Sequence, residues 1–217
     1  MDEELEFASD VAFTPTVKAI QGRKGSRRGY EHAERRGWQT EITDDLAAFI
    51  SAQTSIFFAT ANAAGQPYIQ HRGGPEGFIR ILDQKTLAFA DFSGNRQYIT
   101  LGNLTDNPKA YIFLIDYTHR RRVKIWGEAR VVEDDPALMH SLMPEGYQAR
   151  PEQVIVFTVG AWDVNCPQHI PQRFEAADVA AALAAREQKI AALEAEVAAL
   201  KSQVQATSAH PMQEQPA

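Results

Sequence analysis

The sequence predicts a mainly β protein with short helices, built as a closed or nearly closed antiparallel barrel and followed by a separate helix. Short runs of β-forming residues recur between positions 56 and 162, with turn residues between them. After Arg173 the chain becomes alanine-rich, with an apolar residue at every seventh position. We therefore expect a basic irregular arm over residues 1–40, a barrel domain over 41–175, a heptad helix over 176–205 and a disordered tail over 206–217.

The composition narrows the class of protein. The 217 residues suffice for one ordinary domain with appendages, and 44% hydrophobic with 23% charged residues is typical of a globular chain. A single cysteine excludes an intramolecular disulfide and any zinc site with two or more thiolates, and no other metal site is expected. The N-terminus MDEELEF is acidic where a signal peptide is basic, and no segment is apolar enough to span a bilayer. We expect a cytoplasmic protein without a membrane segment.

Alternation and turn residues place the expected elements. Thr43 is a good N-cap for a helix that buries Leu46, Phe49 and Ile50 on one face. Two further short helices are expected over 96–106, ended by Asn107-Pro108, and over 136–143, with Pro136 in the first turn. The expected strands cover residues 56–60, 68–72, 78–82, 86–90, 109–117, 123–126, 129–133 and 154–162.

The N-terminal arm is the most basic part of the chain. Between Lys18 and Arg36 there are seven basic and two acidic residues, a local charge of +5 within a chain of net charge −6. Four glycines interrupt any helix longer than about two turns. One hypothesis is that this segment contacts nucleic-acid phosphates. Only Tyr30 and Trp38 offer stacking, and the whole chain is acidic, which argues against it.

The C-terminal segment has the heptad pattern of a coiled coil. One seam position holds Leu183, Ile190, Val197 and Val204; the other holds Leu193 and Leu200, with Arg186 as a misfit. Mostly β-branched residues at the first position and leucine at the second favour a parallel dimer. Flanking charges agree, since Lys189 would face Glu194 of a second chain and Glu196 would face Lys201. The alternative is a single amphipathic helix lying on its own domain. A coiled coil this short would reinforce an existing dimer.

The sequence contains no phosphate-binding loop, dinucleotide-binding, nucleophile-elbow or zinc-protease motif. Three clusters of polar residues remain as candidates for a functional site. The first is Gln70-His71-Arg72-Gly73-Gly74, at a strand end. The second is Ser93-Gly94-Asn95-Arg96, at a helix start that suits an anion, because backbone N–H groups, the helix dipole and a guanidinium converge there. The third is Arg120 to Lys124, in which alternate residues share a strand face. For each cluster the plain alternative is a solvated surface or a simple turn.

The order of these clusters resembles the pyridoxamine 5′-phosphate oxidase-like family of FMN-binding split barrels over roughly residues 7–175. The segments that carry the resemblance are Phe89-Ala-Asp-Phe-Ser-Gly-Asn-Arg96, Asn103-Leu-Thr-Asp-Asn-Pro108-Lys-Ala-Tyr-Ile-Phe-Leu114 and Arg121-Arg-Val-Lys-Ile-Trp-Gly-Glu-Ala-Arg130. The segment Trp162-Asp-Val-Asn-Cys-Pro-Gln-His-Ile-Pro171 is similar to a motif of one bacterial branch, the predicted flavin-nucleotide-binding proteins.

The resemblance implies a six-stranded antiparallel split barrel that forms a two-fold homodimer with FMN in clefts between the subunits. It implies cofactor contacts from Arg72, Ser93, Asn95, Arg96, Thr100, Arg122 and Lys124. Arg122 stands where the oxidase has a residue that reaches FMN from the second subunit, and Lys124 follows on the same face. A phosphate dianion needs guanidinium and N–H donors, so we expect a locally cationic site. A cation near the ring would stabilise reduced, anionic flavin.

The chemistry that follows is that of an FMN-dependent oxidoreductase with a small-molecule substrate or nicotinamide donor. The oxidase's substrate-phosphate residues have no match here, so its own substrate is not expected. Candidates for substrate or ring contact are His71, Asn165, Gln168 and Arg173, and the catalytic candidates are Cys166 and His169. The alternative is a non-enzymatic flavin carrier or sensor, and the third hypothesis is nucleic-acid binding.

Overall fold

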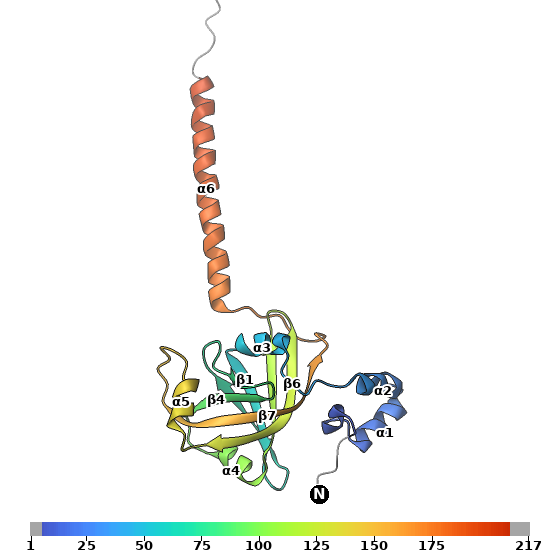
Figure 1. Cartoon of the computed structure of the whole chain (residues 1–217). Helices are drawn as coiled ribbons and strands as arrows, with labels where there is room; N and C mark the ends of the chain where they lie inside the picture. Colours follow the sequence, from blue (N-terminus) through green and yellow to red (C-terminus); the bar gives the residue numbers. More distant parts are fainter. Residues whose placement is uncertain (1–5, 209–217) are drawn as a thin grey trace, which may run out of the picture. The chain divides into compact units, whose positions relative to one another are not determined.

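The computed structural model describes residues 6–208, which divide into two compact units after Pro171 (Figure 1). The strands are β1 (Ser55–Ala61), β2 (Pro67–Gly73), β3 (Arg80–Ile81), β4 (Thr86–Phe92), β5 (Lys109–Asp116), β6 (Arg121–Val132) and β7 (Pro151–Asn165). The helices are η1 (Ala8–Val11), α1 (Pro15–Lys24), α2 (Arg27–Arg36), α3 (Asp44–Ser51), α4 (Ile99–Asp106), α5 (Pro136–Leu142) and α6 (Ala176–Ser208).

One antiparallel sheet forms the barrel, in the order β2-β1-β5-β6-β7-β4-β3. The expected mainly β split-barrel fold with a C-terminal helix is confirmed. The strand number is seven among the described residues, whereas the family resemblance implied six. The seventh, β3, is only two residues long and pairs with β4 at the edge of the sheet.

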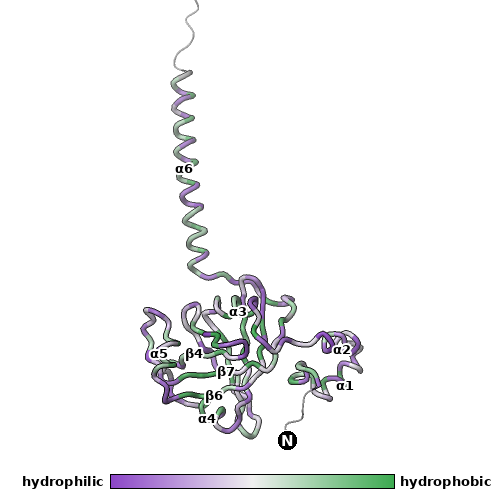
Figure 2. Tube along the Cα trace, viewed as in Figure 1, coloured by the Kyte–Doolittle hydropathy of each residue, from purple (hydrophilic) through white to green (hydrophobic). Residues whose placement is uncertain are grey.

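The barrel core follows from the alternation of the strands. In β1 and β5 every second residue is buried, which brings Ile56, Phe58, Ile112 and Leu114 to the inside. Figure 2 shows hydrophobic residues along the strands of the first unit, β4 and β7 among them. A second, smaller apolar cluster joins β4 and β7 to α5 through Ala88, Ala90, Val154, Val156 and Leu142.

Strand β6 is a single strand of twelve residues, where the sequence suggested two short ones. A bulge between Trp126 and Gly127 shifts its register against β7 and lets one strand bend around the barrel. Gly127 is required there for steric reasons. A Cβ at this position would collide with the carbonyl oxygen of Thr158 and lie 2.8 Å from the ring of Phe157.

Gly127→Ala is therefore expected to lower the free energy of unfolding by at least about 2 kcal/mol, because the β7 backbone cannot move aside without breaking its ladder. Urea unfolding measures the change. Gly102→Ala in α4 is the matched control, since nothing lies within 4 Å of its Cβ position and alanine favours a helix. Equal stability of the two variants would contradict the steric role of Gly127.

The N-terminal arm is helical, which corrects the expectation of an irregular segment. Thr14 accepts a hydrogen bond from the Val17 amide and Pro15 opens α1, so the helix has a regular start. Gly25 and Gly37 have φ of +80° and +78° and end the two helices rather than breaking them. The sequence argument counted these glycines as interruptions when their position makes them caps.

Ion pairs link η1, α1 and α2 to one another. Glu34 is buried and accepts from the guanidinium of Arg27, while Lys18 lies 2.7 Å from Asp10 and 3.5 Å from Glu34. Hydrogen bonding to these carboxylates raises the pKa of both Lys18 and Arg27. Two of the seven basic residues of the arm are thus engaged within it.

The arm attaches to the barrel through aromatic rings. Trp38 stacks on Trp126 of β6 with ring centroids 4.9 Å apart, and Phe13 meets the edge of Trp38 at 5.2 Å. Trp162 donates its indole N–H to the carbonyl of Glu41 at 2.8 Å. This hydrogen bond anchors the connection from the arm to α3.

The second unit contains α6, a helix of 33 residues. It extends three residues beyond the expected end, to Ser208. The rest of the segment predicted to be disordered lies outside the described residues. No helix in residues 6–208 is long and apolar enough to cross a membrane.

Candidate functional site

A small hollow of about 40 Å³ lies where the end of β2, the end of β4 and the start of β7 meet the segment before α4. Strand β2 contributes Tyr68, Gln70 and Arg72, which share one face because they alternate along the strand. The other lining residues are Asp91 and Phe92 of β4, Gly94 to Leu101, and Glu152 and Gln153 of β7. The hollow therefore joins segments that are far apart in sequence.

Arg72 and Asp91 form the floor of this hollow. The Arg72 Nη2 lies 3.0 Å from Asp91 Oδ1, as an ion pair that lacks hydrogen-bond alignment, and Gln153 Nε2 donates to Asp91 Oδ2 at 2.6 Å. Arg72 Nε is also buried and has no hydrogen-bond partner within the described residues. An unpaired buried donor is costly, so this N–H marks a place where an acceptor is missing.

Burial raises the pKa of the Asp91 carboxyl above its ordinary value of 3.8. The charge of Arg72 and the hydrogen bond from Gln153 oppose this rise, and nearby Glu152 adds to it. Desolvation is the largest of these effects, because only 4% of the residue is exposed.

Stability should consequently depend on the ionisation of Asp91. A raised folded pKa means that the contribution of this group is fully present below its unfolded pKa and is lost as the pH rises through the folded value. We expect the unfolding free energy of the parent protein minus that of Asp91→Asn to decrease as the pH rises above 3.8, the ordinary pKa of the group. Urea titrations at several pH values measure this difference. A constant or rising difference would contradict the assignment.

The turn before α4 is held by its own side chains. The Ser93 hydroxyl donates to Glu152 Oε1 at 2.9 Å, and Asn95 Oδ1 accepts from the Gln97 amide at 3.1 Å. Arg96 and Tyr98 both have positive φ, 57° and 53°, a conformation that non-glycine residues rarely adopt. The helix therefore begins at Ile99, which corrects the expected start at Arg96. The Thr100 hydroxyl donates to Gln70 Oε1 at 3.1 Å and links α4 to β2.

Arg96 is the exposed cation of the hollow. Its Nε donates to the Tyr98 hydroxyl at 2.9 Å, and this hydrogen bond raises the pKa of the guanidinium further above its already high ordinary value. The remaining guanidinium N–H groups are free to meet a ligand in the hollow.

Four of the expected cofactor residues thus line one hollow: Arg72, Asn95, Arg96 and Thr100. Ser93 borders it through its hydrogen bond to Glu152. The expectation of a cationic site is not met here, because Asp91 and Glu152 balance the two arginines.

Arg122 and Lys124 lie elsewhere, on the outer face of β6. Lys124 Nζ is 3.1 Å from Asp163 and sits 5.0 Å from the ring centroid of Trp126 and 5.5 Å from that of Trp38. Arg122 Nε is buried without a hydrogen-bond partner in the described chain. Burial raises the pKa of the neighbouring Tyr111 to about 12, against the opposing charge of Arg122.

His71 also belongs to the outer face, since it follows Gln70 on β2 and points to the opposite side. It shares a hydrogen bond of 2.7 Å with the Ser55 hydroxyl, and its ring meets the edge of Phe57 at 5.9 Å. Neither His71 nor the β6 pair lines the hollow.

The remaining candidates follow β7. Asn165 ends this strand and its backbone pairs with Arg122, while Cys166, Gln168 and His169 are exposed in the loop that follows, with His169 at φ 64°. Arg173 is part of the second unit. Cys166, Gln168 and His169 do not line the hollow. Within residues 6–208 no group of three His, Cys, Asp or Glu is placed to hold a metal ion.

A family model described as pyridoxamine 5′-phosphate oxidase matches residues 42–166, which is more than half of the chain. The chain belongs to this family. Similar solved structures include HupZ of Group A Streptococcus, with 24% identity, 61% of this chain and 99% of that chain covered, and a TM-score of 0.46. An FMN-binding protein of Syntrophomonas wolfei has 9% identity, coverage of 67% and 97%, and a TM-score of 0.44.

HutZ of Vibrio cholerae, described as a heme storage protein, has 16% identity, coverage of 57% and 94%, and a TM-score of 0.38. No curated protein matches the chain.

For this member of the pyridoxamine 5′-phosphate oxidase family, sequence reasoning missed the two carboxylates of the hollow. Asp91 offered one signal, because a lone acidic residue within the apolar run Phe89 to Phe92 has to be paired when the strand is buried. Glu152 offered none, since it reaches the site only through the pairing of β4 with β7.

Proposed function

We propose that the protein binds FMN in two clefts between the subunits of a homodimer and acts as an FMN-dependent oxidoreductase. The observation that carries the proposal is the buried, unpaired Nε of Arg72 at the floor of the hollow, beside Arg96 and Asn95. These groups fit the phosphate of FMN, because guanidinium and amide N–H groups are its preferred donors. Asp91 and Glu152 can accept hydrogen bonds from the ribityl hydroxyl groups.

A second subunit supplies the rest of the site in this proposal. The hollow of one chain is far too small for an isoalloxazine ring, since it is about 40 Å³. The outer sheet face carries partly exposed apolar side chains, among them Phe57, Phe113 and Ile115, and Ile69 is 60% exposed. Burying this face against its symmetry mate would bring Arg122 and Lys124 of one chain toward the hollow of the other.

The residues have distinct roles in the proposed chemistry. FMN, when bound, supplies the hydride or electron transfer. Arg72, Arg96, Asn95 and Thr100 hold the phosphate end, with Ser93 ordering the turn. Arg122 and Lys124 contribute positive charge, which favours a reduced, anionic ring. The candidates for substrate or ring contact are His71, Asn165, Gln168 and Arg173, and the catalytic candidates are Cys166 and His169.

An absorbance spectrum of the purified protein, followed by FMN titration, tests the proposal. We expect a flavin spectrum, or saturable FMN uptake with one FMN per chain. Hemin is titrated in parallel, because one similar protein is described as a heme storage protein. Hemin uptake without FMN uptake would overturn the proposal.

Anaerobic addition of NADH or NADPH then separates the oxidoreductase from the carrier. Bleaching of the flavin, with reoxidation by oxygen, supports the enzyme. Bound FMN that neither donor reduces supports a carrier or sensor. Binding of nucleic acid at low salt that is lost at high salt would support the third hypothesis, nucleic-acid binding by the arm. Five basic residues of the arm are exposed and could contact phosphates: Arg23, Lys24, Arg28, Arg35 and Arg36.

We also propose a cytoplasmic location and the four-part division of the chain given above. The lone exposed thiol of Cys166 suits a reducing compartment. Cell fractionation of the full chain tests the location.

A further inference from the structure

Helix α6 carries an apolar stripe that nothing in the second unit covers. Its large apolar side chains are between 43% and 64% exposed: Val179, Leu183, Ile190, Leu193, Val197, Leu200 and Val204. All other residues of the helix whose exposure is described are exposed as well. A lone helix in water gains little stability, so a stripe of this length calls for a partner.

The stripe keeps to a seven-residue repeat, which identifies the kind of partner. Leu183, Ile190, Val197 and Val204 occupy the a position, and Val179, Leu193 and Leu200 occupy the d position, with Arg186 between them. A repeat of seven fits a second helix that winds around the first, whereas packing on a globular surface follows a period of 3.6. β-Branched residues at a with leucine at d favour a coiled coil of two parallel helices.

The surface of α6 is also shaped for such a helix. A shallow groove on it is bordered by Ile190, Leu193, Glu194, Val197, Ala198 and Lys201. Apart from Ala198 at a b position, these residues occupy a, d and e positions, which is the arrangement that receives a side chain from a facing helix.

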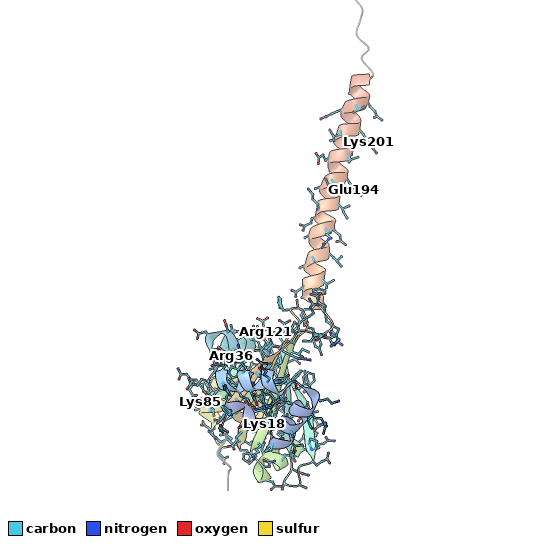
Figure 3. All side chains as sticks on the ribbon, turned by 90° about the vertical axis from the view of Figure 1, so that its right-hand side faces the viewer. Lys18, Arg36, Lys85, Arg121, Glu194 and Lys201 are labelled. Carbon is cyan, nitrogen blue, oxygen red and sulfur yellow. The ribbon has the colours of Figure 1, made fainter. Side chains whose placement is uncertain are left out.

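The charges beside the stripe set direction and register. Lys189 and Glu194 are five residues apart, as are Glu196 and Lys201, and residues at this spacing do not face each other within one helix. In the described chain none of the four takes part in an ion pair, and Figure 3 shows Glu194 and Lys201 along the exposed helix. In a parallel, in-register pair each g residue meets the oppositely charged e residue of the other chain.

We propose that α6 pairs with α6 of a second copy of this chain as a parallel, in-register, two-stranded coiled coil. Arg186 is its weak layer, because two guanidinium groups approach each other at one d level. Its Nη1 lies 3.4 Å from the Ala182 carbonyl of its own helix. This inference does not depend on FMN binding.

Cysteine cross-linking in the full chain tests both the pairing and its direction. In a Cys166→Ser background, Leu183→Cys and Leu200→Cys are each oxidised at low protein concentration. A parallel in-register pair places each new thiol beside its counterpart, so both variants should give covalent dimers. In an antiparallel pair centred on the helix, the two copies of residue 183 would be about 27 Å apart, beyond the reach of a disulfide.

Ala195→Cys, at the f position, is the matched control because it points away from the seam. We expect at least about a fivefold lower covalent-dimer yield from this control than from either seam variant. Cross-links only in the Leu183→Cys/Leu200→Cys double variant would show an antiparallel pair and overturn the proposal. Equal yields from all positions, or none from any, would overturn self-pairing altogether.

Replacing Arg186 with leucine provides a second test, in which the covalent-dimer yield is expected to rise. Arg186→Leu should raise the covalent-dimer yield of Leu183→Cys, because the charged layer becomes apolar. A lower yield would contradict the assignment of residue 186 to the seam. FMN titration of each seam variant should match that of the Cys166→Ser background alone, so a failure of the coiled coil is distinguishable from a failure of the FMN site.

Discussion

Asp91→Ala is expected to lower the free energy of unfolding by about 3 kcal/mol, measured by urea unfolding at neutral pH. The substitution leaves the Arg72 guanidinium, only 15% exposed, without its counter-charge and removes the acceptor of the Gln153 amide. Removing one member of a buried pair costs more than the pair itself contributes. The value lies at the low end of the range for buried pairs because Arg72 retains some contact with water.

The matched control is Asp163→Ala. This carboxylate also pairs with one cation, Lys124 at 3.1 Å, but its side chain is 32% exposed. The expected loss is about 1 kcal/mol or less. Equal losses from the two substitutions would show that burial does not distinguish them, and the structural role assigned to Asp91 would be wrong.

Arg96→Ala is expected to weaken FMN binding about 10- to 100-fold, which corresponds to the loss of a charged hydrogen-bond partner. Arg96 is exposed, and within residues 6–208 its hydrogen-bond partner is the Tyr98 hydroxyl, so its removal should leave the fold intact. It is a cleaner probe than Arg72, whose loss would strand the Asp91 carboxylate. Fluorescence quenching of FMN during titration measures the affinity.

Arg130→Ala serves as the control for general charge effects, because Arg130 is exposed on β6 and does not line the hollow. Its FMN affinity should match that of the parent protein. A comparable loss in both variants, or none in Arg96→Ala, would argue against phosphate binding in this hollow.

The barrel was predictable because alternation reports directly on burial. Strands β1 and β5 bury every second residue, and this period is visible in the sequence. The helices of the arm were not predictable from the sequence. A glycine within a basic segment can either break a helix or cap it, and the outcome depends on where the helix begins. Glu34 stabilises α2 through Arg27 and Lys18, and such pairs depend on the three-dimensional contact.

The site was predictable in part. Arg72, Asn95 and Arg96 stand in the turns where anion donors were expected, and they line one hollow. The left-handed backbone at Arg96 and Tyr98 was not visible, since neither residue type favours it. The carboxylates Asp91 and Glu152 come together through the pairing of β4 with β7, two strands far apart in the chain, so local sequence patterns do not predict the net charge of the hollow.

The length of α6 affects whether two barrels stay associated at low protein concentration. Once two such helices are wound together, the second barrel is tethered, and its encounter with the first becomes intramolecular. The effective concentration of one barrel at the other would then be on the order of millimolar, whatever the amount of protein in the cell. A binding cleft assembled from two chains would in that case persist at dilutions where untethered barrels separate.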